Sequence, residues 1–387
     1  MVVILGYQLY DVARADYGMS QSQAAFQLGL LGLAQFLPLF MLTPIAGVVA
    51  DRFERRAVVA VTMGLDLLIA LALAAFTAKH LINLPLLFTL AAAHGMARVF
   101  IGPAQSAIPP NVVPPELLPR CIALSSIAMQ IGTIVGPALA GLLFGVSAAA
   151  PYGVSSLLLV VAAGSVMTIR PVPPPIENRR THPLRQVGEG VIYVLSERFL
   201  LGCITLDLFA VLLGGATALL PVYARDILHV GPAGLGQMRA APAAGAAMMA
   251  LLLSARPLSR NVGVKMLWAV AAYGLATVIF GISRWYPLSL AMLAAYGAAD
   301  MISVFIRNSL VQLRTPDDKR GRVSAISGLG ISASNELGEM ESGVAAALLG
   351  TTGAVVFGGV AAIVITAIWA WAFPEIRRAR SFDQIAK

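Results

Sequence analysis

Long apolar stretches recur from one end of this chain to the other, and they constrain its fold more than any other feature. A helix needs about 20 apolar residues to cross about 30 Å of hydrocarbon, and most of the stretches reach that length. Charged residues make up 12% of the 387 residues, roughly half the share of about 25% in soluble domains. The pattern predicts an all-α membrane protein.

We expect about twelve transmembrane helices. Their predicted ranges are 1–12, 25–49, 57–78, 83–103, 121–147, 151–169, 199–223, 234–254, 266–284, 287–307, 324–349 and 353–373. A stretch with five prolines and many basic residues separates the sixth helix from the seventh, which is typical of a linker. The sequence therefore predicts an N-terminal bundle over 1–170, a cytoplasmic linker over 171–198, and a C-terminal bundle with a short basic tail over 199–387.

The first stretch is about half as long as the matching seventh stretch, and nothing before Asp11 resembles a cleavable signal peptide. We expect the chain to begin partway through its first helix. Either the start codon is misassigned or the helix is truncated at its N-terminus, and a truncation would put transport in doubt.

The positive charge of the chain is concentrated on one side of the predicted topology. That side holds 21 of the 27 Lys and Arg residues and the opposite side holds four, while Arg98 and Arg239 fall inside helices. The basic connections are 51–56, 114–120, 170–198, 256–265, 307–322 and the tail from Arg377. Cytoplasmic loops carry such an excess. We therefore expect a multi-pass protein of a bacterial inner membrane, with both termini in the cytoplasm and no nucleic-acid partner.

An internal repeat supports two related bundles. A shift of 202 residues superposes three pairs: Arg120 on Arg322, Gly136 on Gly338, and Gly141 on Gly343. Repeats of this kind let one bundle of a transporter rock against the other around a site near the membrane midplane.

A basic loop follows the second predicted helix. Its residues are Gly47, Asp51, Arg52, Arg55 and Arg56. The spacing resembles the loop pattern G-x-x-x-D-R-x-G-R-R of major facilitator transporters, except that Glu54 stands where glycine is usual. In that family the loop gates the transporter, whereas the plainer interpretation is an ordinary positive-inside loop. Ala255 occupies the position equivalent to Asp51 in the second bundle, so we expect a one-sided gate.

Arg98 lies inside the fourth predicted helix, in a pattern with Gly102 that resembles a motif of the same family. An arginine at this depth costs about 2.5–3.5 kcal/mol on insertion scales, so it should face a cavity or a partner. The shift of 202 residues makes Asp300 its counterpart on the tenth helix. A structural ion pair with Asp66 is the alternative.

The fifth helix carries small residues four apart, followed by a proline. The motif consists of Gly132, Gly136, Pro137 and Gly141. Small residues allow close helix approach, and a proline bends a helix because it removes a hydrogen bond. The motif resembles one on the fifth helix of major facilitator exporters, although plain helix packing would also explain it.

The eleventh helix places three carboxylates in an apolar span. Glu336 and Glu339 share a helix face with Asn335, whereas Glu341 is rotated by about 200° from Glu339. Such groups must line a wet cavity, pair with cations or be protonated, and mutual repulsion on one face favours protonation of one of them. A proton-coupled carrier needs this behaviour, and structural pairing, for example with Arg239, is the alternative.

Other polar residues within the spans are weaker candidates. Asp207 on the seventh helix suits either a proton or substrate role or a structural pair with Arg239. His94 suits a hydrogen bond between helices. Cys121 and Cys203 suit apolar packing, because neither lies in a metal-binding pattern.

Several runs in the second bundle together resemble the enterobactin-exporter-like branch of the major facilitator superfamily. They are 206–215, 239–242, 297–317, 321–325 and 334–343. The resemblance implies a proton-driven carrier that moves siderophores or other small amphiphiles out of the cytoplasm by alternating access.

We therefore predict a secondary active exporter in the bilayer, driven by protons and acting as a monomer, with no enzymatic activity, cofactor or metal. The proton-coupling candidates are Glu336, Glu339, Asp207 and Asp300, and the substrate-cavity candidates are Arg98, Arg239, Asn335 and Glu341. An uptake carrier of the same fold and a degenerate, non-transporting membrane protein are the alternatives.

Overall fold

The structure, a computed structural model, describes residues 2–106, 108–170, 183–256, 258 and 260–382. Within these ranges the chain forms helices joined by turns and bends, with no strand. Ten helices of the described chain are long and apolar enough to cross a membrane. Two additions, α1 and the division of α14 at Gly350, bring the bundle to the predicted twelve. The predicted all-α membrane fold is confirmed.

The N-terminal half comprises the helices before the linker. They are α1 (Val2–Ala15), α2 (Gln21–Arg52), α3 (Arg55–Ala78), α4 (Leu84–Ser106), α5 (Pro109–Val112), η1 (Pro115–Leu117), α6 (Leu118–Val146) and α7 (Ala150–Thr168). Within it α2 packs on α4, and α3 packs on both α4 and α7. Three polar side chains tie α1 to its neighbours: Gln8 donates to Thr77 and accepts from the hydroxyl of Tyr152.

The C-terminal half follows the linker. It comprises α9 (Arg198–Leu213), η2 (Ala216–Leu219), α10 (Leu220–Val222), the π-helical turn η3 (Tyr223–Ile227), α11 (Gly231–Ala255), α12 (Val262–Ile282), α13 (Tyr286–Arg314), α14 (Asp317–Ala372) and α15 (Pro374–Arg378). Gly350, at φ 74°, interrupts α14, which separates the predicted eleventh and twelfth helices. Only glycine adopts this conformation without steric cost.

Three predicted helices differ clearly from the observed ones, and one of them, 324–349, begins seven residues earlier, at Asp317. The predicted helix 199–223 is broken at Gly214 and Gly215, because α14 approaches there: Ser342 donates a hydrogen bond to the carbonyl of Gly215, 2.8 Å away. The predicted helix 287–307 continues to Arg314. Arg307, which the topology argument assigned to a basic connection, therefore lies inside α13 and is buried.

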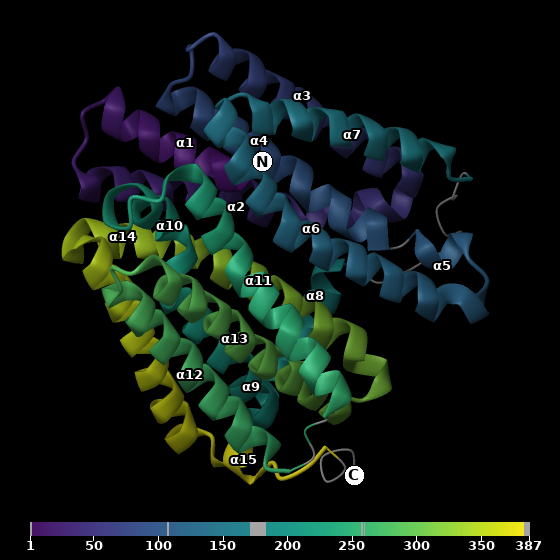
Figure 1. The fold of residues 1–387 in the computed structure, drawn as a ribbon. Helices are drawn as coiled ribbons and strands as arrows, with labels where there is room; N and C mark the ends of the chain where they lie inside the picture. The colour runs from purple at the N-terminus through teal and green to yellow at the C-terminus, as the bar shows by residue number, and fades with distance from the viewer. Residues whose placement is uncertain (1, 107, 171–182, 257, 259, 383–387) are drawn as a thin grey trace.

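The first part of the predicted linker, 171–182, lies outside the described residues. Its second part forms α8 (Pro183–Ser196), which packs against α14, α9 and α2. Figure 1 shows α8 next to the region where the two groups of helices meet. The linker thus includes a helix that touches elements on both sides of it in the sequence.

Two helix pairs join the halves, α2 with α14 and α6 with α11 (Figure 1). Both pairs approach most closely at glycines: the Cβ of a residue replacing Gly343 would lie 2.6 Å from Cα of Gly29, and Gly141 packs against Gly236. These glycines lie toward the helix ends that carry few basic residues. At that side, which we call the basic-poor side, the halves are closed against each other.

Candidate functional site

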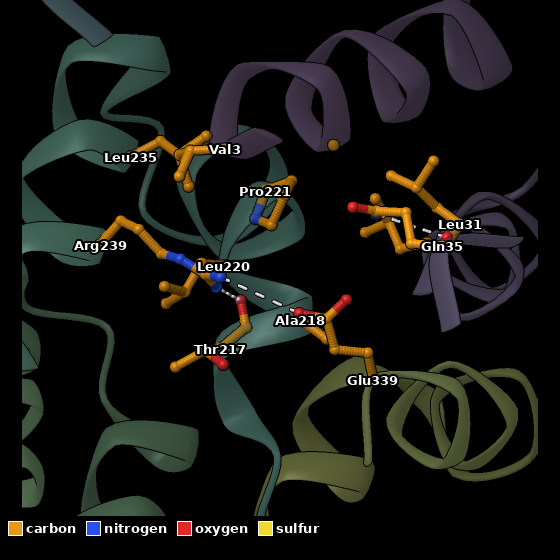
Figure 2. A pocket seen from close by; sticks show the side chains of 12 residues that line it. Val3, Leu31, Gln35, Thr217, Ala218, Leu220, Pro221, Leu235, Arg239 and Glu339 are labelled. Carbon is orange, nitrogen blue, oxygen red and sulfur yellow. Dashed lines mark hydrogen bonds and ion pairs between the residues drawn. The ribbon is translucent and has the colours of Figure 1, made fainter. Parts of the chain in front are cut away.

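A small pocket with one polar end lies between the halves, beside the closed contacts. Its walls come from α1 and α2 on one side and from η2, α10, α11 and α14 on the other. Most lining residues are apolar, including Leu28, Leu31 and Leu235. The polar lining residues, all labelled in Figure 2, are Arg239, Glu339, Gln35 and Thr217.

Arg239 and Glu339 form the polar end of the pocket. Nη2 of Arg239 lies 3.9 Å from Oε1 of Glu339, and Nη1 donates a hydrogen bond to the carbonyl of Thr217 at 3.1 Å. The same carbonyl also accepts the N–H of Leu220 at the end of η2. Glu339 also packs against Gly32 of α2, so this carboxylate lies at the contact between the halves.

Arg98 and Glu336 form a second ion pair, and this one crosses between the halves. Nη1 of Arg98 on α4 lies 2.8 Å from Oε1 of Glu336 on α14. The Glu336 side chain is 9% exposed, whereas that of Arg98 is 52% exposed. One carboxylate thus holds the arginine while about half of the arginine side chain remains exposed. The two glutamates lie about one helical turn apart, so each faces its own cation.

Asp207 and Arg307 form an ion pair in the interior of the C-terminal half. Their side chains are 9% and 3% exposed. Asp207 therefore pairs with Arg307 on α13 and not with Arg239, the partner considered from the sequence. Asp300 lines a small cavity beside this pair, together with Ser303 and Tyr273, and has no hydrogen bond or ion pair within the described chain. Neither aspartate lies in the pocket between the halves.

Asn335 and Glu341 stay apart from the two ion pairs. Asn335 is exposed and Glu341 is partly buried, and in the part of the chain that the structure describes neither has a hydrogen bond or ion pair. Asp66, considered as a partner for Arg98, lies instead 2.8 Å from Nδ1 of His94. That contact ties α3 to α4 and leaves Arg98 to Glu336.

The chain matches the family model of the Major Facilitator Superfamily over residues 2–339. It belongs to this superfamily. The enterobactin exporters EntS of Citrobacter koseri and Shigella boydii are each 28% identical to this transporter over 342 residues, which is 86% of this chain and 77% of each relative.

Solved structures show the same superfamily fold. The nucleoside transporter NupG has a TM-score of 0.71 at 12% identity and covers 96% of both chains. A variant of the peptide transporter POT has a TM-score of 0.73 at 14% identity, covering 98% of this chain and 92% of that one. At such identities the likeness concerns the fold alone. This chain is accordingly a multi-pass membrane transporter.

The basic loop of this superfamily member lies between α2 and α3. Arg56 reaches Oε1 of Glu54 at 2.9 Å and donates a hydrogen bond to the carbonyl of Ile169, just after α7, at 2.8 Å. Glu54, which replaces the usual glycine, thus supplies a carboxylate for Arg56. Arg52 is exposed and Arg55 is partly buried, and the side chain of Asp51 lies outside what the structure describes. Gly47 lies in the last turns of α2.

The glycine-proline motif of α6 divides into two parts. Gly141 packs against Gly236 of α11, and the carbonyl of Pro137 also meets Gly236. Gly132 and Gly136 have open space where a Cβ would lie. The part of the motif nearest the basic-poor side therefore joins the halves, and the rest of it does not.

Three residues of these sites were missed from the sequence. Gln35 lines the pocket between the halves and donates weakly to the carbonyl of Leu31, 3.4 Å away. Thr217 offers its carbonyl to Arg239. Arg307 could have been found, because it lies seven residues after Asp300 and so on the same helix face, but the end of that helix was placed too early.

Proposed function

We propose that this transporter is a proton-coupled exporter of small amphiphiles, such as siderophores, that works by alternating access. The basic side faces the cytoplasm of a bacterial inner membrane, with both termini there, because cytoplasmic loops carry the Lys and Arg excess. The moving bodies are the N-terminal bundle, 1–170, and the C-terminal bundle, 199–387. Similarity to EntS exporters supports the direction and the class of substrate.

The observation that carries the proposal is the pair of α14 carboxylates that face arginines at the junction of the halves. Glu336 holds Arg98 across the junction, and Glu339 faces Arg239 beside the pocket. A proton on Glu336 removes its charge and weakens the only charged contact that it makes with α4 in the described structure. Proton binding is thereby coupled to separation of the halves.

The same arrangement offers a contact for the substrate. About half of the Arg98 side chain is exposed beside Glu336, so an anionic or electron-rich group of a substrate can approach this arginine. In this closed state the pocket between the halves has a volume of about 40 Å³, so it must widen before its apolar walls, formed by Leu28, Leu31 and Leu235, can receive the remainder of an amphiphile.

Transport in reconstituted vesicles tests this function. A catecholate siderophore and a lipophilic dye serve as probes, with an imposed pH gradient as the driving force. We expect flux that depends on the gradient, and we expect Glu336→Gln to abolish the pH dependence because a glutamine cannot exchange a proton. Glu339→Gln should reduce it.

Glu116→Gln is the matched control, because Glu116 lies in η1, is exposed and is remote from the pocket. It should transport like the parent. Flux with an unchanged pH response in both Glu336→Gln and Glu339→Gln would remove these residues from the coupling. Gradient-driven accumulation toward the cytoplasmic side would refute export.

A further inference from the structure

Four charged residues join α1 to the π-helical turn η3 on the basic-poor side. Asp11 and Arg14 belong to α1, and Arg225 and Asp226 belong to η3. Nη1 of Arg225 lies 2.6 Å from Oδ1 of Asp11, and Nε of Arg14 lies 3.5 Å from Oδ2 of Asp226. Each helix supplies one acid and one base. In the first ion pair the acid lies on α1 and the base on η3, and in the second pair this order is reversed. We call these four residues the charged cluster.

Further contacts orient the charged cluster. The hydroxyl of Tyr10, a fully buried residue, donates to Oδ2 of Asp226 at 2.5 Å, and Arg225 also donates to the backbone carbonyl of Asp11 at 3.3 Å. Neighbouring residues of a regular helix point about 100° apart, so Arg225 and Asp226 would ordinarily diverge. The π-helical turn alters this local geometry, and such turns often occur at functional sites.

The contacts around the charged cluster are of a different kind. The halves meet nearby through glycines, Gly29 with Gly343 and Gly141 with Gly236, and these contacts give close packing without charge. The four charged side chains are between 18% and 47% exposed. Water can therefore hydrate each charge once the pairs separate, which allows a reversible contact.

From this arrangement we propose that the charged cluster is a latch that holds the transporter closed on the basic-poor side. The proposal rests on the alternating-access function given above. The latch sets the fraction of molecules whose pocket is reached from that side, and it is separate from the Glu336 and Glu339 pairs that would couple protons. Opening requires both reciprocal pairs to exchange their partners for water.

Thiol labelling tests the latch without any substrate or proton gradient, so its result can be told apart from a failure of the exporter proposal. Cys121→Ser and Cys203→Ala remove both native cysteines, and Ala218→Cys places a reporter in the pocket wall. A membrane-impermeant maleimide is added to the basic-poor side of oriented vesicles. We expect Asp11→Asn combined with Arg14→Gln to raise the labelling rate several-fold.

The exchange of Asp11→Arg with Arg225→Asp keeps one pair with its charges reversed and should bring labelling back toward the parent rate, whereas Asp11→Arg alone should not. Arg284→Gln is the control: Arg284 bonds to Thr352 and Gly281, both in the C-terminal half, so labelling should stay at the parent rate. An unchanged rate in the neutralised variant overturns the latch. If the neutralised variant does not fold, the charge-exchange variant decides: labelling of Asp11→Arg with Arg225→Asp that is as fast as labelling of Asp11→Arg alone also overturns the latch.

Discussion

The buried ion pair of Asp207 and Arg307 gives the sharpest test of the structure. Opposite charges in contact attract by about 4 kcal/mol at an effective dielectric constant near 20, and the low exposure of both side chains leaves little screening by solvent. Loss of one partner of a buried pair costs about 3–5 kcal/mol because the other charge is left uncompensated. We therefore expect Arg307→Met and Asp207→Asn each to destabilise the protein by roughly that amount.

The double variant, Asp207→Asn with Arg307→Met, should lie within about 2 kcal/mol of the parent, because replacement of both charges is often neutral. Unfolding in detergent, followed by circular dichroism as denaturant is added, measures the four members of this cycle. Arg314→Gln is the control, since Arg314 is exposed at the end of the same helix. If the losses of the two single variants add up in the double variant, the side chains are not paired and this part of the structure is wrong.

Two further predictions address other contacts. Gly236→Val should push α11 away from α6, because a side chain there would overlap the carbonyl of Pro137. The maleimide labelling of Ala218→Cys from the basic-poor side should therefore become faster. An unchanged labelling rate would contradict the close contact between α11 and α6. Gln8→Leu should lower the free energy of unfolding by about 1–3 kcal/mol, because the buried hydroxyl of Tyr152 loses its acceptor. Gln23→Leu, in the exposed capping box of α2, is the control. If Gln8→Leu lowers the free energy of unfolding no more than Gln23→Leu does, that reasoning is refuted.

The sequence predicted the helices well because the bilayer imposes a length on every apolar stretch. It was less successful where a helix breaks or continues for reasons of packing. The break at Gly214 and Gly215 depends on the approach of Ser342 from a distant part of the chain. Arg307, at the predicted end of the tenth helix, is buried against Asp207 of the distant helix α9, and α13 continues to Arg314. Neither contact is local, so periodicity and composition could not reveal them.

The candidate charges were recognisable individually, because an ionisable group in an apolar span needs a partner or water. Their pairing was not recognisable. The sequence suggested Arg239 as the partner of Asp207 and Asp66 as that of Arg98, whereas the structure pairs Asp207 with Arg307 and Arg98 with Glu336. The tilt and rotation of whole helices determine which of the possible ion pairs forms. The separation of the α14 pairs from the Asp207 cavity is therefore a result of the fold.

In the alternating-access cycle proposed above, the exposure of these ion pairs agrees with whether the cycle must break them. Asp207 and Arg307 lie within one half and are nearly dry, and a dry pair is costly to separate because the desolvated charges have no substitute partner. The pairs that join the halves are wetter: Arg98 with Glu336 and Arg225 with Asp11 each include a side chain that is about half exposed. Water can replace the partner there as the halves part. A transport cycle that separated the buried pair of Asp207 and Arg307 would cost several kcal/mol each time. A cycle that separates the more exposed pairs replaces their hydrogen bonds with hydrogen bonds to water. The distribution of water among the ion pairs thus separates the contacts that fix each half from those that let the halves move.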